Sequence, residues 1–201
     1  YAHPALDRMI QTQEWLCPIK ADKQEDGAYY SPSRDIVVLP MKAQFNIGGT
    51  PEDTYRGGME FYSTMLHEMT HSTMTPERLN REMGGRFGDP KYAKEELVAE
   101  LTAAMISHSM GFDSKITDNS AAYLDSWIGV LKKEPKFIVS IMADVNKASD
   151  LILDHVDKQR LVLGEDPYLA KNNPLLPLDP NEEVPFKNAA IVKTRSGDYT
   201  F

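Results

Sequence analysis

The sequence has one cysteine, no long apolar run and no cluster of basic residues. Cys17 alone excludes a disulfide framework or a cluster of thiolate metal ligands, and it is typical of a reducing compartment such as the cytoplasm. No apolar run approaches the length that spans a membrane, and the first residues lack the features of a signal peptide. With 22 basic and 30 acidic residues, a formal charge of −8, nucleic-acid binding by this segment is disfavoured.

The rest of the composition indicates a globular protein, with 41% hydrophobic and 26% charged residues in a chain of 201. Because the chain starts at Tyr1 rather than at a methionine, we expect it to be a segment of a longer protein. We predict one domain over residues 1–164, long enough for a single core. Residues 165–201 form a proline-rich extension, in which 189–194 and 199–201 are predicted to pair as a truncated β-hairpin.

Apolar spacing and turn residues predict an α+β fold, with helices packed on a small β-sheet. Helices are expected over residues 2–16, 59–73 and 91–110, after Asn119 or Ser120, and from Pro135 towards Gly164; strands are expected at 29–30 and 36–39. The pair Gly57-Gly58 is expected to break the chain before the second helix. Glycines in the segment 84–88 predict a tight connection, and Asp89-Pro90 predicts the start of the next helix.

The segment His67-Glu68-Met69-Thr70-His71 carries the strongest chemical signal. Residues four apart lie on one face of a helix, so His67 and His71 can reach the same metal ion. Glu68 between them can then contact a metal-bound water, which is the H-E-x-x-H arrangement of zinc-dependent peptidases. Catalytic zinc usually has three protein ligands and one open position for water. The segment therefore predicts a Zn²⁺ site that lacks one ligand.

The following helix offers carboxylates for the third position. We predict Glu96 as the ligand and Glu100, one turn later, as the hydrogen-bond partner of a histidine ring N–H. The reverse assignment, with Glu100 as the ligand, stays open. Glu95 points about a third of the way round the helix and is expected to be solvated. Ala103 and Ser107, on the same stripe as Glu96, are small enough to let the two helices approach closely.

Such a site would hydrolyse a peptide bond. The ion lowers the pKa of a bound water to roughly 7, and Glu68 takes the proton and passes it to the leaving amine. An extended protein or peptide substrate is expected to lie along an exposed sheet edge at Ile36–Leu39. The oxyanion also needs a side-chain partner. Four residues are candidates, with no basis for a choice: Tyr92, His108, Tyr123 and His155.

Three other interpretations compete with hydrolysis. The histidines and glutamates can be ordinary surface residues of two helices. Two histidines and one carboxylate also form the facial triad of non-haem iron oxygenases, although that chemistry leaves Glu68 without a role. Finally, the chain can be a non-catalytic binding module, with a structural or vestigial metal site, that protects the DNA of a mobile element.

Several segments in order resemble the C-terminal, zincin-like metallopeptidase domain of the ArdC antirestriction proteins. The resemblance covers about residues 1–160 and is carried by the segments 28–40, 66–71, 78–81, 84–88, 92–101, 122–127 and 130–132. It implies a minimal, gluzincin-like zincin in a cytoplasmic protein of mobile elements that shields incoming DNA from restriction. The resemblance also implies that a separate N-terminal domain, which we expect to be absent from this chain, binds single-stranded DNA in the family. The first glutamate of the family's E-x-x-A-D or E-x-x-A-N helix is a ligand, which implies this role for Glu96 and places Glu100 at the Asp or Asn position.

Overall fold

The fold is dominated by α-helices that pack together beside a small β-sheet. The computed structural model describes residues 1–82, 89–114, 121–174, 192–193 and 199–200. In chain order the elements are α1 (Pro4–Thr12), β1 (Ile19–Lys20), β2 (Tyr29–Ser31), β3 (Ile36–Val38), the 3-10 helix η1 (Lys42–Phe45), α2 (Pro51–Ser72), α3 (Pro90–Ser109), α5 (Leu124–Lys133), α6 (Phe137–Val162), the 3-10 helix η2 (Ala170–Asn172), β4 (Val192–Lys193) and β5 (Tyr199–Thr200). The predicted α+β class is confirmed.

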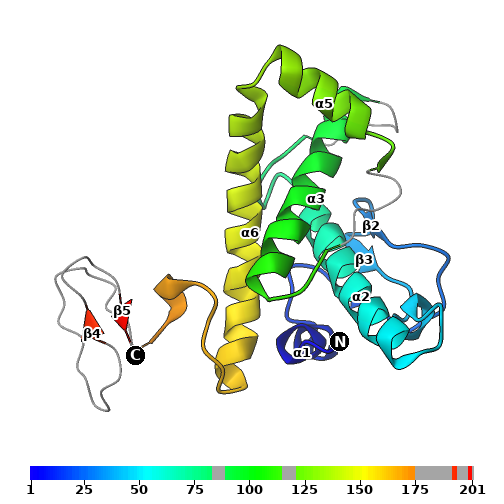
Figure 1. The fold of residues 1–201 in the computed structure, drawn as a ribbon, viewed down its shortest axis with the longest axis vertical. Helices are drawn as coiled ribbons and strands as arrows, with labels where there is room; N and C mark the ends of the chain where they lie inside the picture. The colour runs from blue at the N-terminus through cyan, green and yellow to red at the C-terminus, as the bar shows by residue number, and fades with distance from the viewer. Residues whose placement is uncertain (83–88, 115–120, 175–191, 194–198, 201) are drawn as a thin grey trace.

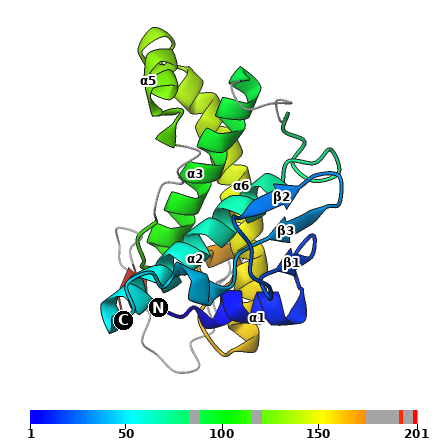
Figure 2. The same cartoon turned by 90° about the vertical axis from the view of Figure 1, so that its right-hand side faces the viewer.

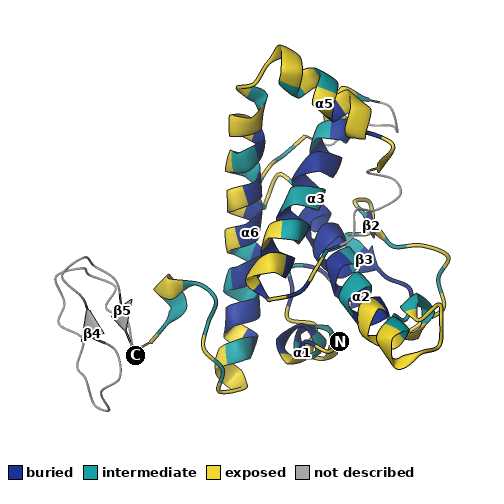
Figure 3. Ribbon diagram, in the orientation of Figure 1, coloured by how far each residue is buried: buried dark blue, intermediate teal, exposed yellow. Residues whose placement is uncertain are grey.

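Helix α3 lies between α2 and α6, and the three form the centre of the structure (Figures 1 and 2). Buried residues concentrate where these helices face each other, whereas α5 and the outer side of α6 are largely exposed (Figure 3). The main core also receives α1 and the sheet, and it includes Leu6, Met9, Val37, Leu66, Met69, Ile106 and Ile152. A second, smaller core packs α3, α5 and α6 around Trp127, whose indole N–H donates to the carbonyl of Ala93 at 2.8 Å.

The sheet has the strand order β1-β3-β2, with β3 parallel to β1 and antiparallel to β2. Both predicted strands are present, but β1 is an addition, because two residues are too short to produce an apolar pattern. The expectation that Ile36–Leu39 forms an exposed edge is therefore wrong. Ile36–Val38 is the central strand, and the backbone N–H of Leu39 donates to the carbonyl of Lys20 at 2.8 Å. The outer strands of this sheet are β1 and β2.

Helix α2 continues through Gly57 and Gly58, so the predicted chain break at this pair is also wrong. The two glycines allow other segments to approach the helix instead. A Cβ atom at Gly57 would lie 2.4 Å from the carbonyl oxygen of Phe45, and one at Gly58 would lie 2.4 Å from that of Tyr1. The helix begins at Pro51 behind Thr50, whose hydroxyl accepts from the N–H of Asp53. The histidines consequently lie in the last two turns of a long helix.

Local signals account for the ends of the other helices. Helix α1 stops before the predicted limit because Gln13 adopts a left-handed conformation, with φ of 55°. Helix α3 starts as predicted, and the carboxylate of Asp89 accepts from the N–H of Lys91 at 2.8 Å. The predicted connection at 84–88 and the predicted cap at Asn119 or Ser120 lie outside the described residues. The long last helix begins at Phe137, two residues after Pro135.

Part of the predicted extension packs against the domain. The buried carboxylate of Asp157 on α6 accepts from the backbone N–H groups of Tyr168 and Leu169 at 2.6 and 3.0 Å. Within the predicted hairpin, β4 pairs antiparallel with β5. The domain division at residue 164 stays a prediction. None of the described helices has the length and apolar character needed to cross a membrane.

Candidate metal centre

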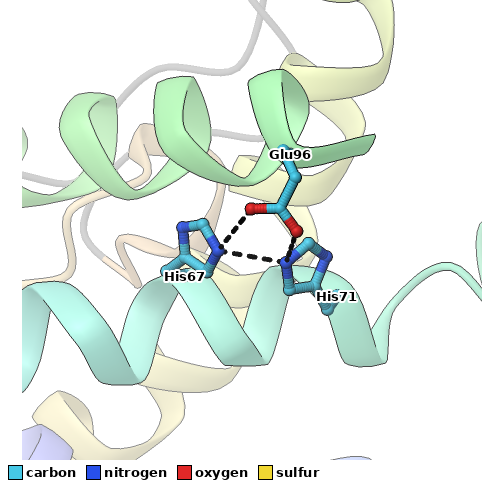
Figure 4. Close-up of side chains that lie close together, drawn as sticks. All are labelled: His67, His71 and Glu96. Carbon is cyan, nitrogen blue, oxygen red and sulfur yellow. Dashed lines mark hydrogen bonds and ion pairs between the residues drawn. The ribbon is translucent and has the colours of Figure 1, made fainter. Parts of the chain in front are cut away.

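Two helices bring His67, His71 and Glu96, the three residues predicted as metal ligands, close together (Figure 4). The histidines project from α2, and Glu96 reaches down from α3 with one oxygen towards each ring. The two Nε2 atoms are 3.0 Å apart. The Glu96 oxygens lie 3.5 Å from Nε2 of His67 and 3.3 Å from Nε2 of His71. All three residues are buried, so the polar atoms converge in a region from which bulk water is largely removed.

This convergence requires a positive charge. The Nδ1 atom of each ring faces a carboxylate, so a proton on Nδ1 leaves a lone pair on Nε2 of both His67 and His71. Two lone pairs 3.0 Å apart, beside the carboxylate of Glu96, repel each other unless a proton or a metal ion lies among them. The donor set therefore fits a cation.

The spacing of the donor atoms also fits a divalent ion. Atoms bound at about 2.0–2.1 Å lie about 3.4 Å apart around a tetrahedral ion and about 2.9 Å apart around an octahedral one. The observed separations of 3.0, 3.3 and 3.5 Å cover both cases. Two imidazoles and a carboxylate suit zinc and other first-row metals. The residues thus fit a divalent metal, and their spacing does not select one geometry.

Carboxylates also hold the outer nitrogen of each ring. Nδ1 of His67 lies 3.4 Å from an oxygen of Glu100, an ion-pair contact rather than a well-aligned hydrogen bond. Nδ1 of His71 lies 3.3 Å from an oxygen of Glu95. The expectation that Glu95 is solvated is wrong, since its side chain is 3% exposed and forms a fork with Arg81. Close packing of α3 on α2 places this face of α3 inside the protein.

The carboxylates shift the pKa of the histidines. Burial lowers the pKa of both rings, but Glu100 and Glu96 at His67, and Glu95 and Glu96 at His71, outweigh it and raise the pKa above its ordinary value. Burial alone would raise the pKa of the Glu96 carboxyl, but the contacts with His67 and His71 hold it far below its usual range. In the metal-free protein a proton therefore takes the place of the metal charge, and metal binding must displace it.

Glu68 lies next to this cluster without being part of it. The residue is 7% exposed. No other residue in the described ranges forms a hydrogen bond or an ion pair with its carboxylate. Glu68 directly follows His67 on α2, and its negative charge adds, after burial and the contacting carboxylates, to the increase in the pKa of His67 and His71. A carboxylate that has no partner in the described part of the chain and lies beside a candidate metal centre is suited to accept a proton from water.

The four candidates for oxyanion stabilisation are dispersed. Tyr92 and Tyr123 face each other, with ring centroids 6.0 Å apart, at the smaller core. His108 is exposed near the end of α3, three turns after Glu96. His155 packs edge-on against Trp15, 5.0 Å between centroids, and its Nδ1 contacts the carbonyl of Leu151. Only Tyr92 shares a face of α3 with Glu96, because it precedes it by four residues.

Comparison with known proteins agrees with the site. A family model described as a zincin-like metallopeptidase matches residues 5–144, which include both helices of the candidate metal centre. The chain belongs to the zincin-like metallopeptidase family. A curated relative, DNA primase TraC of Escherichia coli, is 38% identical over 168 residues; the match covers 78% of this chain and 15% of TraC.

Two solved structures of the antirestriction protein ArdC from the R388 plasmid share the fold of the present chain. The Mn(II)-bound structure has a TM-score of 0.61 and 31% identity, and covers 78% of this chain and 53% of ArdC. The metal-free structure has a TM-score of 0.59 and 33% identity, and covers 79% of this chain and 52% of ArdC. The predicted resemblance to ArdC is confirmed. This chain spans about half the length of ArdC and a small part of TraC.

The contact of Arg81 with Glu95 and the burial of Glu95 are features of this candidate centre that were not predicted from the sequence. Arg81 lies on the segment after α2, ten residues from His71, where helical periodicity carries no information. The adjacency of Glu95 and Glu96 was a weak signal, because two neighbouring carboxylates that are both buried need cationic partners, but the sequence does not show that Glu95 is buried. One partner is the histidine pair, and the other is Arg81.

Proposed function

We propose that this chain is the catalytic domain of a metal-dependent peptidase within an ArdC-type antirestriction protein. The observation that carries the proposal is the convergence of His67, His71 and Glu96 next to the buried carboxylate of Glu68, which forms no hydrogen bond or ion pair with the described residues. A bound divalent ion would polarise the scissile carbonyl and acidify a water molecule. The chain's own residues then hold the ion, orient the rings and move the proton.

Each residue has a distinct task in this proposal. His67, His71 and Glu96 bind the ion, and Glu100 keeps the ring of His67 oriented through Nδ1. Glu68 accepts the proton of the attacking water at its carboxylate and donates it to the amine that leaves. A purely structural metal site needs no such base, so the presence of Glu68 favours hydrolysis over a binding module.

The ion and the partners follow from the same reasoning. We propose Zn²⁺ as the ion, because two imidazoles and one carboxylate form a common catalytic zinc site. Mn²⁺, which the related ArdC structure contains, is the competitor to test. The substrate class is a protein or peptide in the cytoplasm, and contact with single-stranded DNA belongs to a domain outside this chain.

Substitution of Glu68 by Gln tests the proposal. The amide keeps the size of the side chain but cannot accept the proton, so cleavage of a fluorogenic peptide library by the Zn²⁺-loaded protein should fall by about 10²–10⁴-fold. Metal content should stay at the wild-type level, while His71→Ala should lose both metal and cleavage. In the full-length protein, DNA protection that survives Glu68→Gln unchanged would show that the domain acts by binding.

A further inference from the structure

Arg81 holds Glu95 in a two-pronged grip. Its Nε donates to one carboxylate oxygen at 2.9 Å, and one terminal nitrogen donates to the other oxygen at 2.7 Å. The two side chains are 6% and 3% exposed. Parallel N–H···O bonds of this kind fix both the position and the plane of a carboxylate, and they are strong because both groups are charged.

The same guanidinium is anchored to the end of α2. One terminal nitrogen donates to the hydroxyl of Thr73 at 2.9 Å, and the other donates to the carbonyl of Thr70 at 2.9 Å. Thr70 directly precedes His71. Arg81 therefore connects the last turn of the helix that carries His71 with the carboxylate that contacts the ring of His71.

We propose that Arg81 is a positioning residue of the metal centre, acting on His71 through Glu95. The oxygen of Glu95 lies 3.3 Å from Nδ1 of His71, so a fixed carboxylate keeps the proton on Nδ1 and directs the Nε2 lone pair to the ion. The inference rests on the metal-binding part of the proposed function. It adds a residue that touches neither metal nor substrate.

Arg81 also balances charge around the site. Four carboxylates, those of Glu68, Glu95, Glu96 and Glu100, surround or contact the two histidines. Arg81 neutralises the carboxylate of Glu95, which contacts Arg81 on one side and His71 on the other. Without it, a buried and mobile carboxylate next to His71 could turn towards the ion and change the set of ligands. Correct coordination therefore depends on both the charge of Arg81 and its fork shape.

Arg81→Lys tests this inference, because lysine keeps the charge but cannot form the planar fork. The affinity of the purified protein for Zn²⁺, measured by competition with a chromophoric chelator, should fall by about 10–100-fold. The visible absorption spectrum of the Co²⁺-loaded protein should also change, because it reports the positions of the ligands. A role confined to stabilising the fold would lower the melting temperature and leave the spectrum unaltered.

Arg78→Lys provides a matched control. Arg78 forms a similar fork with Asp35, at 2.9 and 2.7 Å, and donates to the carbonyl of Ser72 at the end of α2. Neither Arg78 nor Asp35 contacts the metal cluster in the described structure. The variant should lose stability but keep wild-type Zn²⁺ affinity and the wild-type Co²⁺ spectrum.

The outcomes separate this inference from the proposed function. Zn²⁺ affinity of Arg81→Lys equal to that of the wild type, with an unchanged Co²⁺ spectrum, overturns the inference and leaves the metal site intact. A wild type that binds no divalent ion overturns the proposed function itself. If Arg81→Lys does not fold, the double variant Arg81→Met/Glu95→Gln removes both buried charges together. It should show the same weakened Zn²⁺ binding, and unchanged binding refutes the inference.

Discussion

Glu96→Gln decides which carboxylate completes the metal centre. The sequence left Glu96 and Glu100 as alternatives, whereas in the structure they meet different nitrogens. Glu96 lies 3.5 and 3.3 Å from the two Nε2 atoms, and Glu100 lies 3.4 Å from Nδ1 of His67, on the other side of that ring. An ion between the Nε2 atoms can be reached by Glu96 and not by Glu100. Glutamine keeps the volume and removes the negative charge.

The expected magnitudes differ for the two carboxylates. The binding free energy of zinc at structural sites with four ligands is about 10–16 kcal/mol, or about 3 kcal/mol per ligand. A loss of about 3 kcal/mol lowers the affinity roughly a hundredfold. Loss of a residue that only orients a ligand costs about 10–100-fold. Because the contact of Glu100 with His67 is not a well-aligned hydrogen bond, Glu100→Gln should lie near the lower limit. We therefore expect Glu96→Gln to weaken Zn²⁺ binding about tenfold more than Glu100→Gln.

Competition with a chromophoric chelator at constant pH measures both affinities, and far-ultraviolet circular dichroism checks that each variant is folded. His108→Ala serves as the control, since His108 is exposed near the far end of α3 and should leave Zn²⁺ binding unchanged. If Glu100→Gln proves the more damaging of the two, Glu100 is the ligand and the assignment fails. Wild-type affinity in Glu96→Gln would remove Glu96 from the site altogether.

Two further predictions concern pH and packing. Burial lowers the pKa of His67 and His71, but the carboxylates raise it by more, so the net shift is an increase. Protonation of the two rings therefore stabilises the metal-free fold below about pH 6.5, and this contribution is lost as pH rises through the raised pKa. The increase in melting temperature on adding Zn²⁺ should therefore grow from about pH 6 to pH 9; a constant increase would contradict the proton–metal exchange. In α2, Gly57→Ala should lower the melting temperature, because a clash 2.4 Å from the Phe45 carbonyl costs about 1–3 kcal/mol against a gain of about 1 kcal/mol in helix propensity. Gly129→Ala in α5, where no described atom beyond the local helix backbone lies within 4 Å of the added Cβ, should raise it, and a loss of stability there would refute the packing argument.

Predictions from the sequence succeeded where the signal was local. The i, i+4 spacing placed His67 and His71 on one face, and Asp89 marked the start of α3 through its own side chain. Predictions from the sequence failed where the role of a residue depends on contact with a distant segment. Gly57 was predicted to break the chain because glycine disfavours helices, yet it lies within a continuous helix. Its lack of a Cβ atom allows the backbone of Phe45 to approach that helix closely. Likewise, the central position of Ile36–Val38 depends on β1, a strand too short to be recognised.

By itself, the sequence determined that a histidine pair with an intervening glutamate lies near the end of a helix, because backbone hydrogen bonds within a helix fix the direction of its side chains. Only the tertiary structure decided which carboxylate of α3 faces the Nε2 atoms and that Glu95 is buried against Arg81. These features depend on the packing of α3 against α2 and on the path of the chain after α2. Both result from side-chain contacts between separate segments, and the spacing of residues along the chain does not indicate these contacts.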